Sequence, residues 1–258
     1  STPIKSSAAS DVYKRQNWDT SLGVTAQYFT LNNNLSIEPR VALKWKINPK
    51  HSLALAYGLH SRREKLDYYF VEKVVNGKNQ SNRYLDFSRA HHVGMTYDWN
   101  INQNLHLKIE PYFQYLFRIP VEKNSSFSVI NHEEFYLDRI LTNTGQGRNY
   151  GIDITLEQYM KNGFYYMITG SLFKSKYRGG DNVWRNTRLD KNYLLNLLAG
   201  KEWMVGKLKQ NVLSLNGRLF FQGGERYTPV NEERSQTEHD IFFDETKAYS
   251  KRFNPSLP

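Results

Sequence analysis

The sequence predicts an all-β chain that forms part of an antiparallel transmembrane β-barrel. Three observations support this prediction. Apolar and polar residues alternate in about nine segments, the links between these segments are short and long in turn, and aromatic residues recur beside the short links. Because the sequence ends after a long link and before a partner strand for the segment at 212–222, we expect a partial barrel.

The composition combines many aromatic rings with a polar average. The 258 residues include 18 Tyr, 14 Phe and 5 Trp, yet the mean hydropathy is −0.68 and 39% of the residues are hydrophobic. A disordered chain would be poor in such rings, so they must be buried in protein or in lipid. No apolar run reaches the roughly 18 residues that a spanning helix needs, which excludes a helical membrane protein but not one built from strands. The absence of cysteine excludes disulfides and thiolate sites.

The distribution of charge argues against a nucleic-acid partner, although the formal net charge of +10 would suit one. Arg40, Lys44, Lys46 and Lys108 fall at alternate positions of predicted strands, and other basic residues are spread through the links. We therefore interpret the positive charge as the polar side of a sheet.

Residues 1–16 look foreign to the rest of the chain. They contain the string SAASDVYKRQ, which resembles a translated sequencing-adapter remnant, and they have neither the basic nor the apolar part of a secretory signal. We treat residues 1–16 as a non-native leader, exclude them from fold reasoning and expect the gene to extend upstream. Residues 17–258 are then expected to form one partial barrel domain, truncated at both ends.

The predicted strands have two unlike faces. The first places Leu22, Val24 and Tyr28 on one face, with small or polar residues between them, and the second alternates Leu43 and Trp45 with lysines. The same period recurs in seven later segments, although the segments near 164 and 193 alternate less cleanly. These later segments lie at 53–59, 93–101, 105–117, 150–157, 164–173, 193–203 and 212–222.

Link lengths alternate along the chain. Short links lie at 48–51, 102–104, 161–163 and 206–210, and long links lie at 61–86, 118–149, 174–192 and from 223 onward. Outer-membrane barrels have tight turns at one end and long loops at the other, which is the arrangement that this alternation predicts. One short link at 32–34 falls on the loop side and departs from the pattern.

Aromatic residues stand just before the short links. Trp45, Trp99, Tyr159 and Trp203 occupy such positions, as the aromatic girdle at one membrane boundary would. In a soluble β-sandwich, which is the alternative architecture, these rings would be core residues. The membrane interpretation therefore predicts that certain residues lie exposed on one outer face. These are Leu43, Trp45, Tyr97, Trp99, Leu107 and Ile109.

Pairing is predicted to be interrupted at two prolines and at two edges. Pro39 and Pro111 lie inside predicted strands, where we expect bulges or broken ladder bonds, because proline has no N–H to donate. Consecutive strands are expected to pair as hairpins. The segments at 18–30 and 212–222 are expected to form the two unpaired edges of an open sheet.

Motifs for catalysis or metal binding are weak. The glycines at 145–151 lead into a strand rather than a helix, which argues against a nucleotide-binding loop. His91 and His92 point to opposite faces of a strand, and the His-Glu-Glu cluster at 132–134 is more typical of solvated loop charge than of a metal site. No nucleophile stands beside a base, so we expect no enzyme, no cofactor and no metal site.

Four segments carry a resemblance to a known family. They are GRNYGID at 147–153, GSLFKSKY at 170–177, VWRNT at 183–187 and GERYTP at 224–229. In this order and spacing they resemble parts of the barrel of TonB-dependent receptors of Bacteroidetes. The resemblance covers nearly everything from Trp18 to Pro258. The resemblance does not include four parts of the family, namely the amino-terminal plug, the TonB box, the first strands and the last strands.

The resemblance implies a receptor of the bacterial outer membrane. In this family a barrel, typically of about 22 strands, holds a plug and imports a scarce solute with energy supplied through TonB. The implied partners are outer-membrane lipid, the TonB complex acting through the missing plug, a small solute, glycan or peptide ligand, and a surface lipoprotein. An outer-membrane structural or adhesion barrel without active transport is the alternative, and no nucleophile–base pair favours a barrel enzyme. Since one scaffold serves many solutes, the substrate stays open.

Aromatic and cationic residues of the long links are the predicted ligand contacts. Rings supply stacking area and guanidinium groups recognise charge. The alternative role for each of these residues is to pack the loops together. The predicted contacts are Tyr68, Tyr69, Trp184, Arg185, Arg226 and Tyr227.

Overall fold

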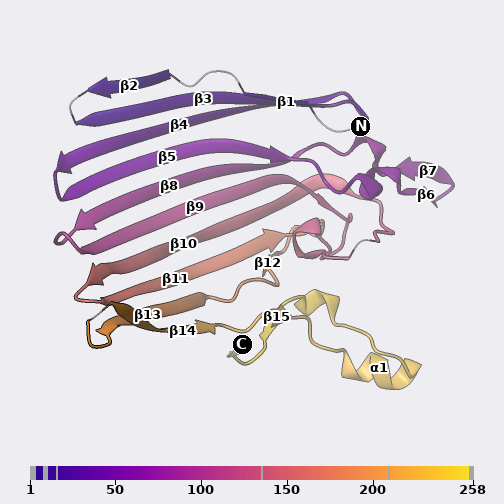
Figure 1. Cartoon of the computed structure of the whole chain (residues 1–258). Helices are drawn as coiled ribbons and strands as arrows, with labels where there is room; N and C mark the ends of the chain where they lie inside the picture. The colour runs from indigo at the N-terminus through magenta and orange to yellow at the C-terminus, as the bar shows by residue number, and fades with distance from the viewer. Residues whose placement is uncertain (1–3, 8–10, 16, 135, 209, 256–258) are drawn as a thin grey trace.

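Long antiparallel strands form a single wall, as the alternation predicted. The computed structural model describes residues 4–7, 11–15, 17–134, 136–208 and 210–255. The long strands are β3 (Trp18–Phe29), β4 (Asn34–Asn48), β5 (His51–Arg62), β8 (Ser88–Asn100), β9 (Leu105–Val121), β10 (Thr142–Lys161), β11 (Phe164–Arg178), β13 (Tyr193–Val205) and β14 (Asn211–Gln222). They pair in this order to form an open, curved sheet (Figure 1).

Three short strands complete this sheet. β1 (Ile4–Ser7) and β2 (Asp11–Arg15) pair with β3, and β12 (Trp184–Asn186) pairs with β11. Over the described residues the sheet therefore has 12 strands, and all of its pairs are antiparallel. The predictions of an all-β partial barrel wall and of pairing between consecutive long strands are confirmed.

The ladder register separates an apolar face from a polar face. Successive side chains of a strand point to opposite sides, so residues paired across the ladders share a face. One row of paired residues, given at the end of this paragraph, defines the side of the sheet that we call the apolar face. The opposite side, which carries Lys44 and Asp98, is the polar face. The row consists of Trp18, Trp45, Leu53, Tyr97, Ile109 and Ile154.

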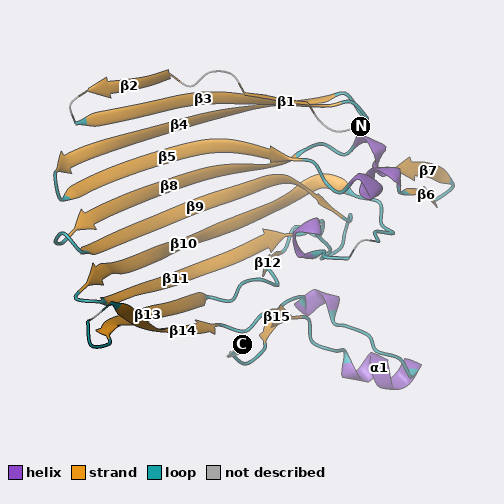
Figure 2. Cartoon of the chain, in the orientation of Figure 1, coloured by secondary structure: helices purple, strands orange, loops and turns teal. Residues whose placement is uncertain are grey.

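The residues predicted to face outward lie on the apolar face and are not enclosed between two layers. Trp45 is 37% exposed, and the other five are partly exposed. Ile37 and Leu55, on the same face, are 57% and 48% exposed. No second sheet covers this face in the described part of the chain (Figure 2). An uncovered apolar surface of this extent is typical of a wall that faces lipid rather than of a soluble sandwich.

The two ends of the sheet differ as the link lengths predicted. Tight turns join the strands at the left in Figure 1, whereas long segments leave them at the right. In the turn between β10 and β11, Asn162 and Gly163 both have positive φ, at 53° and 72°. Positive φ at both central residues is the geometry of a type I′ turn, whose twist matches that of a β-hairpin.

The helices are short and lie among the loops (Figure 2). Not one of the helices among the described residues is long and apolar enough to span a membrane. A separate small hairpin, β6 (Glu72–Val75) with β7 (Lys78–Ser81), projects from the loop between β5 and β8. The helices are α1 (Glu232–Glu238) and the 3₁₀ turns η1 (Leu66–Phe70), η2 (Asn82–Tyr84), η3 (Val129–Asn131) and η4 (Glu245–Lys247).

The predicted interruptions at the prolines are confirmed. Between β4 and β5 the ladder runs only to Arg40 and Gly58, next to Pro39. Beyond that point side chains replace the ladder: Ser61 N donates to Glu38 Oε1 at 3.1 Å, and Gln27 Nε2 donates to Ser61 O at 3.0 Å. Between β8 and β9 the ladder skips the row of Pro111 and the next row, that of Glu110. A missing N–H therefore ends or interrupts the ladder at both sites.

One of the two edge predictions is wrong. Within the described residues β14 pairs only with β13, as expected, but β3 is paired along its other side with β1 and β2. Backbone N–H and C=O groups at a strand edge can pair with any extended segment, so residues 4–7 and 11–15 can pair there whatever their origin. Their assignment as a non-native leader remains a prediction. Among the described residues β3 does not pair with β14, so the sheet stays open.

A small core lies where the loops fold over the polar face. A bulge at Arg118, with φ of 54°, shifts the register of β9 and brings Ile119 into this core, and Val121 is buried two residues further along. Glycine is required opposite them, since a Cβ on Gly145 would lie 2.4 Å from Val121 Cγ1. The buried members of this loop core are Phe29, Tyr68, Tyr69, Leu85, Phe87, Ile119, Val129, Leu137 and Leu141.

Candidate ligand-binding site

Tyr68 and Tyr69, from turn η1, pack the loops together. Their exposed fractions are 2% and 1%, and the Phe29 ring lies 5.0 Å from the Tyr69 ring. Glu64 N donates to the Tyr69 hydroxyl at 3.2 Å. Burial raises the pKa of Tyr69 to about 12. The two rings thus take the packing role that the sequence left open, and ligand contact by them stays a prediction.

Trp184 and Arg185, both in β12, lie on opposite sides of the sheet. The Arg148 guanidinium stacks 4.4 Å from the centre of the Trp184 ring on the apolar face. Arg185 instead donates to both carboxylate oxygens of Asp181, at 3.0 and 2.6 Å. Burial raises the pKa of Asp181, but the hydrogen bonds from Arg185 and from Val183 N outweigh it and hold the pKa below its ordinary value. Arg185 is therefore engaged within its own loop.

Arg226 anchors the segment after β14 through a buried carboxylate. Its Nε donates to Asp190 Oδ2 at 2.8 Å, and Arg252 Nη2 approaches the same oxygen at 3.3 Å. Ser175 N donates to Asp190 Oδ1 at 3.0 Å. Asp190 is 0% exposed, so this one carboxylate joins the wall to β15 (Arg226–Tyr227) and β16 (Lys251–Arg252).

The candidate site that includes predicted contacts is a cavity of about 490 Å³ between the loops. The loop after β9, the β11–β13 link and the segment after β14 all contribute to its lining. Two of the six predicted contacts, Arg226 and Tyr227, line it, and the centre of the Tyr227 ring lies 4.4 Å from that of Phe253. The other rings of the lining are Phe127, Phe243 and Tyr249, and its charged groups are Arg139, Arg188, Glu225 and Glu245.

Most charges of the loop cavity are already balanced inside the protein. Arg188 pairs with Glu133 and, at 3.4 Å, with Glu225. Glu245 accepts a hydrogen bond from Ser126 Oγ at 2.7 Å. Burial and the nearby Glu245 carboxylate raise the pKa of Tyr249, which keeps its hydroxyl protonated and able to donate. Stacking rings beside paired charges suit a small solute with both a flat apolar surface and hydrogen-bonding groups.

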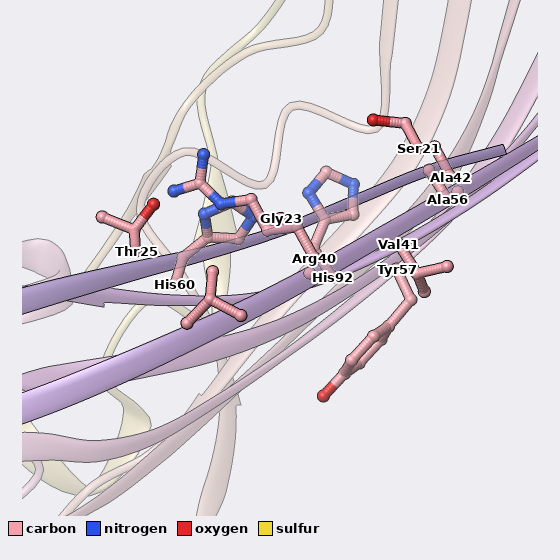
Figure 3. Close-up of a pocket in the computed structure, with 13 residues that line it drawn as sticks. Ser21, Gly23, Thr25, Arg40, Val41, Ala42, Ala56, Tyr57, His60 and His92 are labelled. Carbon is pink, nitrogen blue, oxygen red and sulfur yellow. The ribbon is translucent and has the colours of Figure 1, made fainter. Parts of the chain in front are cut away.

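A second cavity, of about 410 Å³, is a groove along the wall. Figure 3 shows Arg40, His60 and His92 on one side of the sheet and Tyr57 on the other. On the polar face the floor of this groove consists of small residues, which leave room beneath the three basic side chains. These floor residues are Ser21, Gly23, Ala42, Ala56, Gly58 and Gly94.

The cluster at 132–134 is engaged in loop contacts. Glu133 pairs with Arg188, and the His132 ring packs against Phe127 at 5.4 Å. Lys65 Nζ donates to the backbone oxygen of Glu134 at 3.2 Å. In the residues that the structure describes, no group of three or more His, Cys, Asp or Glu side chains is placed to hold a metal ion.

The sequence analysis missed most of the loop cavity. Phe127, Arg139, Arg188 and Tyr249 come from three separate links, and no local motif marks them. It also missed Asp190, since a buried acid in a polar link looks like any solvated loop charge. Only the packing of distant segments brings these groups together.

Comparison with solved structures shows which known fold this architecture matches. The ferripyoverdine receptor of the outer membrane of Pseudomonas aeruginosa matches 90% of this chain at 13% identity, with a TM-score of 0.65. The outer membrane transporter YddB from Escherichia coli matches 96% at 13% identity (TM-score 0.63), and the FrpB iron transporter from Neisseria meningitidis matches 84% at 11% identity (TM-score 0.57). The match is to their fold.

This chain has the fold of part of an outer-membrane receptor barrel. The match spans 30%, 36% and 32% of the three solved chains, so it corresponds to about a third of each. No protein-family model and no curated protein matches the sequence. At this level of identity the likeness concerns the fold and leaves the ligand open.

Proposed function

We propose that this chain forms part of the wall of an outer-membrane receptor that imports a scarce solute with energy supplied through TonB. The observation that carries the proposal is the uncovered apolar face, on which Trp45 is 37% and Leu55 48% exposed. Lipid is the environment that such a face requires, and the polar face opposite it would then line the interior of the barrel.

The loop cavity supports a receptor over the alternative, an adhesion or structural barrel. Its rings and paired charges form a concave site of about 490 Å³, within the usual range for small ligands. In addition, the similar solved structures include an import receptor, a transporter and a ferripyoverdine receptor. We propose a small solute, glycan or peptide as ligand, Arg226 and Tyr227 among its contacts, and a surface lipoprotein and the TonB complex as partners. The Bacteroidetes type of receptor is part of the same proposal.

The location is tested by fractionating cells that make the full-length product of this gene. We expect it in the outer membrane, with a gel mobility that changes on heating, as barrels show. Recovery in the soluble periplasm would contradict the membrane part of the proposal.

Transport is tested separately, by following which solutes cells remove from a defined mixed medium. Strains lacking this gene and strains lacking TonB should both leave the same solute behind, and the wild-type gene should restore its uptake. Replacing Tyr227 by Ala should weaken uptake, because one stacking wall of the cavity is lost. Correct membrane location without any difference in solute removal would favour the adhesion or structural barrel.

A further inference from the structure

The apolar face changes character at its loop end, over β8, β10 and β11. Along β10 the order of apolar-face residues toward the loops is Ile152, Tyr150 and Arg148. Along β11, Leu172 is followed on the same face by three cations in succession. We call these residues, with one cation from β8, the outer cationic cluster. It consists of Arg89, Arg148, Lys174, Lys176 and Arg178.

Cations of the outer cationic cluster face one another across a ladder. Arg148 and Lys176 are direct partners of β10 and β11, and both side chains are exposed. Like charges directly opposite each other destabilise a sheet. An anion bound between them would turn this repulsion into attraction.

Several cations on the polar face, by contrast, have an acidic partner. There Arg40 lies 3.2 Å from Glu38, Lys46 lies 3.2 Å from Asp19, and Lys108 lies 3.0 Å from Glu110. Within the described part of the chain, no ion pair includes a member of the outer cationic cluster.

Two guanidinium groups of the cluster each have one N–H without an internal acceptor. The Nε atoms of Arg89 and Arg178 are buried and have no hydrogen-bond partner among the described residues. Lys174 donates to Asn192 Oδ1 at 2.9 Å, which leaves its charge uncompensated. The protein therefore gathers positive charge on this face without supplying the anion that would balance it.

We propose that the outer cationic cluster binds the phosphate groups of lipids in the outer leaflet. This inference rests on the proposed outer-membrane location, which places the loop end of the apolar face at the headgroups. The rings of Tyr150 and Trp184 stand beside the cations, and such rings lie at the boundary between the hydrocarbon and headgroup layers. Guanidinium and ammonium groups bind phosphate through charge-assisted hydrogen bonds, and each adds attraction to an anionic surface.

The test uses the detergent-solubilised full-length gene product, titrated with mixed micelles that contain lipid A, a phosphorylated glycolipid. Neutral micelles of phosphatidylcholine are the reference. The variant R148Q/K176Q should bind the lipid A micelles about 30-fold more weakly, which corresponds to about 2 kcal/mol for two surface cations. The matched control is K44Q/K78Q, which removes the same net charge from exposed lysines on the polar face and in the β6–β7 hairpin and should bind as wild type does.

Each other outcome overturns the proposal. Equal binding by R148Q/K176Q and wild type would show that the cluster is only a hydrated surface. Equally weakened binding by R148Q/K176Q and K44Q/K78Q would show that binding depends on net charge and not on the cluster. Competition by inorganic phosphate at similar concentration would assign the site to free phosphate instead of lipid. Failure of the proposed function is read separately, from the membrane fractionation and the solute-removal assay, since the micelle titration depends on neither.

Discussion

Asp190 shows how a single buried side chain can hold a site together. Its carboxylate is 0% exposed and binds both Arg226 and Arg252, so it joins the segment after β14 to the wall. Removing one partner of a buried ionic cluster leaves the remaining charges without compensation. The shape of the loop cavity depends on this attachment, because Arg226 and Tyr227 form part of its lining.

We predict that Asp190→Ala loosens residues 223–253 while the wall stays paired. The local free energy of opening should fall by about 3 kcal/mol, the usual cost of breaking a buried ionic cluster. Amide hydrogen exchange of this segment measures the change. Asp244→Ala is the control, because Asp244 pairs with the exposed Lys247 three residues away and does not join this segment to the wall. Equal exchange in the two variants would show that Asp190 is not the anchor.

Tyr69 limits the stability of the loop core at alkaline pH. Burial raises its pKa from 10.0 to about 12, so the folded state holds the phenolic proton more tightly than the unfolded state does. The contribution of the protonated Tyr69 to the stability of the folded state is complete below pH 10 and is lost as the pH rises from about 10 to about 12. We predict that the loops of the wild-type protein open over this window, as measured by hydrogen exchange near residues 64–70. Tyr69→Phe should remove this part of the pH dependence, and an unchanged alkaline profile would contradict the assignment.

At the scale of elements, turn chemistry and ladder chemistry determine how strands meet. Asn162 and Gly163 supply the two positive φ angles of a tight hairpin, whereas Pro39 ends a ladder and leaves Glu38 and Gln27 to bind the freed backbone of Ser61. Both effects depend on local residue type. This is why the hairpins and the interruptions could be predicted from the sequence.

We predict that Gly163→Ala destabilises the hairpin of β10 and β11. An added Cβ would lie 2.3 Å from Glu202 O, and alanine disfavours the φ of 72°. The expected cost is about 1–3 kcal/mol, seen as a lower midpoint of heat modification of the full-length gene product. Gly23→Ala is the matched control, since a Cβ there meets no atom within 4 Å and should cost little. A midpoint equal to that of the control would argue against strain in this turn.

At the scale of the whole molecule, the sheet is a boundary between two environments. Its apolar face is uncovered, while its polar face carries the wall groove and, at one end, the loop core. Neighbouring residues on one strand should therefore respond in opposite ways to an added charge. Leu55 and Ala54 in β5 provide such a pair, because their ladder partners place them on opposite faces.

We predict that Leu55→Arg reduces the amount of assembled barrel in the outer membrane far more than Ala54→Arg does. An arginine on the lipid face near the middle of the bilayer costs about 2–4 kcal/mol, whereas one on the polar face remains hydrated. Quantifying the heat-modifiable band in outer-membrane fractions of the two variants measures the difference. Equal losses would contradict the assignment of the apolar face to lipid.

The sequence by itself determined the class of fold and much of its layout. Side-chain alternation, as in the segment of Leu43 and Trp45, requires two unlike faces, and link lengths separate a turn end from a loop end. Such signals are local, so they can be read without coordinates. They were also sufficient to place the breaks at Pro39 and Pro111.

Only the tertiary structure decided how the loops meet. It buries Tyr68 and Tyr69, places Trp184 and Arg185 on opposite sides of the sheet, and assembles the loop cavity from links that lie far apart in sequence. It also pairs β1 and β2 with β3, where the sequence predicted a bare edge. The physical reason is that loop packing and edge pairing depend on distances between remote segments, whereas alternation and turn geometry depend on neighbouring residues.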